Sequence, residues 1–443
     1  MEPSGQIHRR MFFPLCPFTL GRVSSSPSTT PAADHARFLS TRRFGGLDGL
    51  RALSVIAVIW HHTSGRPGPW ISSQGHYGVD LFFALSGVLI TTLLLRERDR
   101  RGRISLIGFY IRRAGRIFPL YYLVLATYVA LVLATRADTA EGRYFLSKLP
   151  AFLTYTSNWF VDLGAGASVI FYFAWSLATE EQFYLFWPPL LACLLLLRPR
   201  RTAHVLAALG ALIVINQVAL ASSSSTLAVT ILGSLALPIL LGAALAVALH
   251  SPTGYAVLRS TLGRRWSAPA LALTLLASIA VPTPEQVTQV VMAALVAAMC
   301  MRDDSWIHPV LSCRPVAWVG VVSYGIYLMH MLVANAVRLL LGEQFSVALF
   351  AVTTVVVIGV AAVSYRMLEA PLIERARALS ARHAERVTAA PQRTDAFADR
   401  ARERRSAEQP RRITRPARLS APRAASDARR APRAPSARRR CRR

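Results

Sequence analysis

The chain has 443 residues, of which 53% are hydrophobic, and a formal net charge of +28. Few soluble domains combine these values, and no basic face interleaved with aromatic residues indicates binding to nucleic acid. The five cysteines show neither a CxxC pair nor a regular spacing, so we expect no disulfide framework and no metal site.

Long apolar segments occupy residues 47 to 370, and each is close to the roughly 20 residues that span a bilayer. They predict an all-α, polytopic integral membrane protein with about ten spans, at 47–64, 78–95, 115–135, 171–197, 203–221, 227–249, 267–282, 286–301, 316–341 and 345–368. Pro150–Trp159 is predicted as a re-entrant or interfacial segment. Residues 1–42 and 377–443 lack hydrophobic periodicity, so we expect disordered tails around a membrane domain at 43–376.

The distribution of lysine and arginine predicts the topology. Alternate connections at 96–116, 198–201, 250–267 and 302–314 hold sixteen Lys and Arg, whereas the connections on the other side hold four. Because basic residues concentrate in cytoplasmic loops, both termini are predicted to lie in the cytoplasm.

The first span carries ionisable residues at both of its ends. Arg51 and His62 are eleven residues apart, about 1100° around an α-helix, so they share one face and are separated by about 16 Å along the axis. Ionisable residues inside a membrane helix usually face the bundle interior and mark a functional path. The alternative is that Arg51 ends the span in the headgroup region and His62 caps it on the far side.

The second span, GVDLFFALSGVLI, places Asp80 at its outer end, near the predicted depth of His62. This depth favours a carboxylate–imidazole pair that would orient the ring. The alternative is an acid that only compensates the helix dipole. Ser86 and Gly87 are small enough to let another helix pack closely.

Arg113 and Arg116 follow in the stretch FYIRRAGRIFPLYY, three residues apart on one helical face. This arrangement suits a guanidinium clamp for phosphate groups. Positive-inside anchoring would explain the same arginines without a ligand.

Three later segments also carry polar groups. Glu180 and Glu181 lie in the aromatic, apolar stretch WSLATEEQFYLFWP, near the predicted outer face, where we expect one of them to pair with an arginine or histidine. His330 lies near the middle of the span that contains SYGIYLMH. In YRMLEAPLIER, Arg366 and Glu369 fit simple anchors at the inner interface.

In this order, GLDGLRALSVIAVIWHH, GVDLFFALSGVLI, FYIRRAGRIFPLYYL, WSLATEEQFYLFWP, SYGIYLMH and YRMLEAPLIER resemble the motifs of the membrane acyltransferase family 3 over about residues 44–376. The family's Arg-x10-His spacing selects His62 rather than His61. Glu180 matches the acid of its S-V-E-x-Q-F-Y pattern, with Thr179 in place of valine. Some members carry an added extracytoplasmic hydrolase-like domain, so we expect delivery to the acceptor by this module or by a separate protein.

The resemblance implies an O-acyltransferase of a bacterial plasma membrane. The donor would be acyl-CoA, most simply acetyl-CoA, and the acceptor a hydroxyl of a cell-surface glycan, a lipid or a small molecule. His62 would be the base, and Asp80 or Glu180 would orient it. Arg51 would hold a donor phosphate or anchor its helix.

Four more residues have predicted binding roles: Arg113 and Arg116 toward the donor, and Glu181 and His330 toward the substrates. A proton-coupled transporter or flippase is the competing class, since it also needs buried His, Glu and Arg, but the two halves of the chain share no matching motif. A non-catalytic membrane scaffold would leave the intramembrane charges unexplained.

Overall fold

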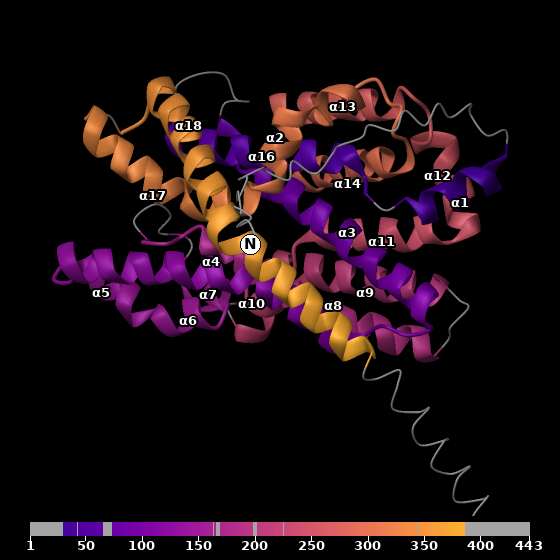
Figure 1. Ribbon diagram of the computed structural model, residues 1–443, viewed down its shortest axis with the longest axis horizontal. Helices are drawn as coiled ribbons and strands as arrows, with labels where there is room; N and C mark the ends of the chain where they lie inside the picture. The colour runs from indigo at the N-terminus through magenta and orange to yellow at the C-terminus, as the bar shows by residue number, and fades with distance from the viewer. Residues whose placement is uncertain are drawn as a thin grey trace, which may run out of the picture. The chain divides into compact units, whose positions relative to one another are not determined.

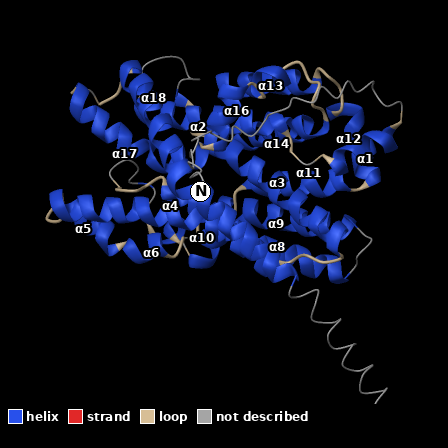
Figure 2. Cartoon of the chain, viewed as in Figure 1, coloured by secondary structure: helices blue, strands red, loops and turns tan. Residues whose placement is uncertain are grey.

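A computed structural model describes residues 30–41, 43–64, 73–162, 164, 169–197, 202–224, 226–342 and 344–385. The contacts discussed below all lie within Met1–Ala384. Every regular element in the described ranges is helical, and none of them is a strand (Figure 2). The predicted all-α class is therefore confirmed.

Figure 1 shows the order of the helices along the chain. Their bounds are α1 (Pro31–Ser40), α2 (Gly45–Thr63), α3 (Tyr77–Arg101), α4 (Leu106–Thr135), α5 (Ala140–Ser147), α6 (Leu149–Leu153), α7 (Ser157–Phe160), α8 (Ala174–Leu197), α9 (Thr202–Ala221), α10 (Leu227–Gly233), α11 (Leu237–His250), α12 (Pro252–Leu262), α13 (Ser267–Ala280), α14 (Glu285–Met301), α15 (His308–Leu311), α16 (Arg314–Val321), α17 (Ser323–Leu341), α18 (Val347–Ser364) and the π-helical turn η3 (Tyr365–Glu369).

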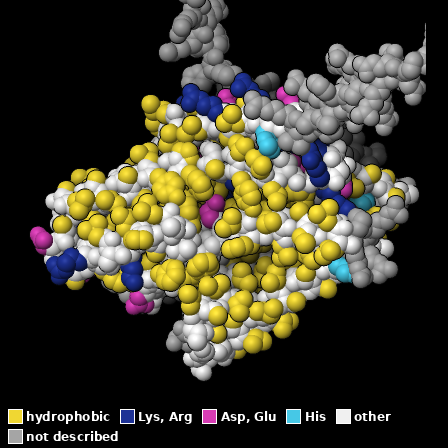
Figure 3. Space-filling model, turned by 90° about the horizontal axis from the view of Figure 1, so that it is seen from below, with side chains coloured by type: hydrophobic (Ala, Val, Ile, Leu, Met, Phe, Trp, Pro, Cys, Tyr) yellow, Lys and Arg dark blue, Asp and Glu magenta, His cyan; other side chains and the backbone are white. Residues whose placement is uncertain are grey.

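Several of these helices are long and apolar enough to cross a membrane. Among the described residues there are five, at Tyr77–Arg101, Leu106–Thr135, Thr202–Ala221, Ser323–Leu341 and Val347–Glu385. A sixth span results if α10 and α11, which are bent by 52° at a short break, are counted together. Figure 3 shows a face covered largely by hydrophobic side chains, as contact with lipid would require. Multiple apolar helices are thus present, whereas ten spans remain a prediction.

Three predicted segments differ from the helices that form. The span predicted at 316–341 is divided at Val322 into α16 and α17. The last span continues beyond the predicted 345–368 and reaches Glu385. The basic stretch at 96–116 is mostly helical rather than a loop, because α3 extends to Arg101 and α4 begins at Leu106.

The tails are more ordered near the membrane domain than we expected. Residues 31–40 form α1, which packs on the rest of the protein through ion pairs from Asp34 to Arg259 (2.7 Å) and from Arg37 to Asp303 (2.8 Å). Residues 377–385 continue the last helix. The other residues of both predicted tails, apart from residues 30 and 41, lie outside the described ranges.

Close packing of α3 against α11 depends on small residues on both helices. A Cβ atom added to Gly87 would collide with the carbonyl of Ile239, and one added to Gly242 would collide with the carbonyl of Ala84. The close approach predicted from Ser86 and Gly87 is therefore confirmed for Gly87. This contact determines which face of α3 points into the bundle.

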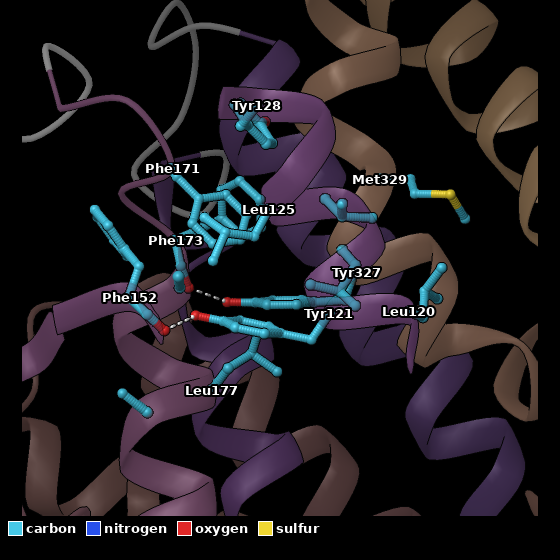
Figure 4. Close-up of a cluster of buried hydrophobic side chains, with 14 of the residues drawn as sticks. Leu120, Tyr121, Leu125, Tyr128, Phe152, Phe171, Phe173, Leu177, Tyr327 and Met329 are labelled. Carbon is cyan, nitrogen blue, oxygen red and sulfur yellow. Dashed lines mark hydrogen bonds between the residues drawn. The ribbon is translucent and has the colours of Figure 1, made fainter. Parts of the chain in front are cut away.

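The segment Pro150–Trp159 forms two short helices, α6 and α7, whose backbone is tied to α4 and α8. The hydroxyl of Tyr121 donates to the carbonyl of Phe152 at 2.7 Å (Figure 4), and Gln182 donates to the carbonyl of Tyr155 at 2.8 Å. Non-helical backbone inside a membrane is tolerated only where protein groups satisfy it. The re-entrant or interfacial placement of this segment remains a prediction.

Candidate active site

A pair of histidines lies where the end of α2 meets α17. The ring centroids of His62 and His330 are 5.0 Å apart. Nδ1 of His62 is 2.9 Å from the carbonyl of Val58, and Nδ1 of His330 is 2.5 Å from the carbonyl of Tyr327. Because a carbonyl can only accept, each Nδ1 must donate, which leaves Nε2 of each neutral ring with a free lone pair. Two rings with available basic nitrogens therefore face one another.

The two histidines differ in exposure. His330 is fully buried, and its Nε2 has no hydrogen-bond partner among the described residues. His62 is partly exposed. Of the two, His62 is therefore the ring that a substrate can reach, with His330 behind it.

Among the described contacts, Asp80 does not meet His62, the ring that we expected it to orient. Its carboxylate accepts from Nε2 of Gln289 on α14 at 3.3 Å. Within the described contacts, the ring of His62 is held by Val58, a residue of its own helix. Gly78, two residues before Asp80, packs against Ser54 and Val58, so Asp80 lies beside the middle of α2, where it meets α14 instead.

Glu180 also lies away from His62, on the side of α8 that faces the arginines. Its carboxylate accepts hydrogen bonds from the hydroxyls of Ser86 and Tyr184. The guanidinium of Arg113 lies over the Tyr184 ring, 4.4 Å from its centroid. Glu180 is thus connected to Arg113 through Tyr184 and has no direct ion pair in the described part of the chain.

Three guanidinium groups gather from α2 and α4. Arg51 and Arg113 both lie close enough to Arg116 for their charges to repel it. Arg51 is 3.5 Å from the carboxylate of Asp48. Arg113 and Arg116, by contrast, form no ion pair with any described residue. This cluster therefore has positive charge available for an anionic ligand.

Two acids border this arginine cluster without neutralising it by direct contact. Glu181 lies within electrostatic range of Arg113, and Glu369 within that of Arg116. Glu369 is 4% exposed and lies in the π-helical turn η3. It is therefore buried in the protein rather than anchored at the interface as predicted. Single π-helical turns occur frequently at functional sites.

Polar side chains also lie between the arginine cluster and the histidine pair. The hydroxyl of Tyr327 is 2.5 Å from that of Ser176 and donates to the carbonyl of Phe173 at 3.1 Å (Figure 4). The Tyr327 ring centroid lies 5.6 Å from that of His330. Glu180 is near enough to interact electrostatically with Tyr327. The site thus has two centres, joined by residues of α8 and α17.

The described residues contain no group of three His, Cys, Asp or Glu side chains placed to hold a metal ion. The three cysteines within the described ranges, Cys193, Cys300 and Cys313, are free thiols. Acid–base and anion-binding groups are the chemistry that this arrangement offers.

Comparison with known protein families agrees with this chemistry. The family model described as an acyltransferase domain matches residues 44–366, which include both centres of the site. The chain belongs to this acyltransferase family. The helix α1 lies before the match, and the last described helix continues beyond it.

Several bacterial proteins are similar to part of this chain. The chain is 28% identical over 306 residues to "Peptidoglycan O-acetyltransferase OatA" of Listeria monocytogenes, and the aligned region covers 64% of this chain and 48% of the relative. It is 30% identical over 317 residues to "Putative peptidoglycan O-acetyltransferase YrhL" of Bacillus subtilis, covering 65% and 48%. It is 37% identical over 175 residues to "Putative O-acetyltransferase SACOL0978" of Staphylococcus aureus, covering 37% and 27%.

The chain therefore spans about half the length, or less, of these curated relatives. No solved structure is significantly similar to this member of the acyltransferase family.

Sequence reasoning missed three residues that shape this site. Tyr184 and Ser86 hold Glu180, and Arg338 contacts the backbone of His62. Tyr184 follows Glu180 by four residues, a spacing that places both on one helical face and could have indicated the contact. Nothing local distinguishes Arg338, since a basic residue near a helix C-terminus is expected from the helix dipole alone.

Proposed function

We propose that this chain is a multi-pass O-acyltransferase of a bacterial plasma membrane. Its membrane domain would extend over 43–376, with ten spans and both termini in the cytoplasm. The helix α8 and the shorter helices α2, α13 and α14 would supply the remaining spans, tilted or buried inside the bundle. The observation that carries the proposal is the arginine cluster of Arg51, Arg113 and Arg116 near one end of α2, together with the paired histidines at the other end.

The donor would be acyl-CoA, most simply acetyl-CoA, entering from the cytoplasmic side. CoA carries several phosphate charges, and guanidinium groups bind phosphate oxygens in a bidentate manner. Arg113 and Arg116 would bind these phosphates, with Arg51 beside them. The support for this role is that neither Arg113 nor Arg116 has an ion-pair partner among the described residues. A polyanion would neutralise these two guanidinium groups, whereas a neutral ligand would leave their charges to repel one another.

The acyl end of the donor would extend along α2 toward His62, about 16 Å from Arg51. Nε2 of His62 would take the proton of an acceptor hydroxyl while the hydroxyl oxygen attacks the thioester carbonyl. The carbon–sulfur bond then breaks, and the departing CoA thiolate takes the proton from His62. The carbonyl of Val58 would hold His62 in the required tautomer, the role first predicted for Asp80 or Glu180. His330 would line the acceptor side of this centre.

The acceptor would be a hydroxyl of a cell-surface glycan, and the names of two relatives favour peptidoglycan. Glu181 would contribute to substrate binding beside the arginines. Acyl groups would then cross the membrane while CoA remains on the cytoplasmic side.

Sealed vesicles of known orientation test this proposal. Labelled acetyl-CoA supplied on the cytoplasmic face should acetylate a muropeptide supplied only on the opposite face. Transfer that requires both substrates on the cytoplasmic side would refute the acceptor route. Activity of acetyl-CoA from the outer face alone would refute the donor route and the topology. Movement of an intact substrate across the membrane without thioester cleavage would support the transporter class instead.

A further inference from the structure

Arg338, near the end of α17, connects three separate parts of the protein around the histidine pair. Its Nη2 donates to the carbonyl of His62 at 2.5 Å, and its Nε donates to the carbonyl of Gln344 at 3.0 Å. Its Nη1 donates to the side-chain oxygen of Asn335, one turn earlier on α17, at 2.7 Å. Each guanidinium nitrogen is therefore engaged within the protein.

The hydrogen bond from Arg338 to His62 provides a donor for a backbone carbonyl at the C-terminal end of α2. The last carbonyls of an α-helix have no partner inside the helix and need donors from elsewhere. Arg338 supplies one donor to His62, and the backbone N–H of Ser346 donates to the carbonyl of Thr63 at 3.0 Å. The end of α2 that carries the histidine is thus held by α17 and by the connection that follows it.

The same helix carries His330, eight residues before Arg338. Eight residues advance about 800° and rise about 12 Å, so the two side chains lie about 80° apart on α17. Arg338 therefore fixes α2 to the helix that presents the second histidine. The relative position of the two rings, 5.0 Å between centroids, depends on this connection.

We propose that Arg338 is a positioning residue for His62: it holds the end of α2 so that Nε2 of His62 faces the reacting hydroxyl, with His330 behind it. This inference rests on the proposed function of His62 as the base. A guanidinium is suited to the role because its planar fork directs several hydrogen bonds at once, which a lysine ammonium cannot reproduce. A displacement of a reacting group by about 1 Å can cost about 100-fold in rate.

Steady-state kinetics of the full-length protein in lipid test the proposal. Arg338→Ala should lower kcat by about 10- to 100-fold with unchanged KM for acetyl-CoA and for the muropeptide. Arg338→Lys should recover only part of the lost kcat. Arg136→Ala, which removes an exposed arginine at the end of α4, is the matched control and should retain wild-type kinetics. An unchanged kcat in Arg338→Ala, or a raised KM with unchanged kcat, would overturn the positioning role.

Asn335→Ala gives a second test, and the single variant keeps Arg338 itself in place. Asn335 is exposed, and its side chain contacts Arg338, so its loss should lower kcat by a smaller factor. In the Arg338→Ala background it should have no further effect, because coupled residues are not additive. Additive losses in the double variant would contradict the proposed connection.

Nitrogen NMR of the protein labelled at histidine tests the positioning role of Arg338 without relying on acyl transfer. The Nδ1–H signal of His62, assigned by its absence in His62→Gln, should shift or split in Arg338→Ala and remain unchanged in Arg136→Ala. An unchanged His62 signal in Arg338→Ala would overturn the positioning role even if activity fell. If the wild type transferred no acyl group, the proposed function would fail, and this signal would still show whether Arg338 positions His62.

Discussion

Separate replacement of His61 and His62, the two adjacent histidines of α2, should show which of them acts as the base. His62 faces His330, and its Nδ1 is held by Val58. His61 is turned by about 100° on the helix and lies 5.7 Å from His76 between ring centroids. We expect His62→Ala to lower the rate of acyl transfer by about 100- to 10,000-fold, the usual contribution of a general base. At about 1.36 kcal/mol for each factor of ten, this loss corresponds to about 2.7–5.4 kcal/mol of transition-state stabilisation.

The assay is initial-rate transfer from labelled acetyl-CoA, with each variant reconstituted at the same protein-to-lipid ratio. Both variants should keep the wild-type chromatographic profile, because both rings are partly exposed side chains at the end of α2. His61→Ala should remain within tenfold of the wild-type rate. Equal losses in His61→Ala and His62→Ala at equal protein yield would refute the assignment of His62 as the base.

Three further predictions follow from the contacts around the site. Combining Arg113→Ala with Arg116→Ala should weaken acetyl-CoA binding about tenfold or more by calorimetry and reduce its salt dependence, because these groups are proposed to meet the donor phosphates; unchanged affinity would limit both arginines to a role in topology. Tyr121→Phe should lower the free energy of unfolding by about 1–3 kcal/mol, and with it the thermal midpoint, because the buried carbonyl of Phe152 loses the hydroxyl that donates to it. The affinity for acetyl-CoA should not change. Gly87→Leu should reduce the yield of folded protein, because the side chain would force α3 away from α11; a normal yield would contradict the close contact.

The amino-acid sequence by itself determined the class of this protein and the family to which it belongs. Long apolar segments can satisfy their backbone in a bilayer only as helices, so the all-α architecture followed from composition and segment length. The 3.6-residue period placed Arg51 and His62 on one face of α2, and the motifs placed the remaining polar residues in order along the chain. These inferences use only distances within a single helix.

Tertiary structure decided which of these residues meet. Asp80 was expected at the depth of His62, but α3 packs so that Asp80 lies beside the middle of α2 and bonds to Gln289 of α14. Glu369 lies at the end of an apolar run, as an interfacial anchor would, yet η3 places it in the interior near Arg116.

The physical reason is that periodicity defines the relative directions of side chains on one helix but not the rotation of that helix among its neighbours. That rotation depends on packing, such as the contact between Gly87 and the Ile239 carbonyl, and on long-range hydrogen bonds, such as that from Arg338 to His62. These contacts join residues more than 100 positions apart, so no local pattern could identify the partner of either residue.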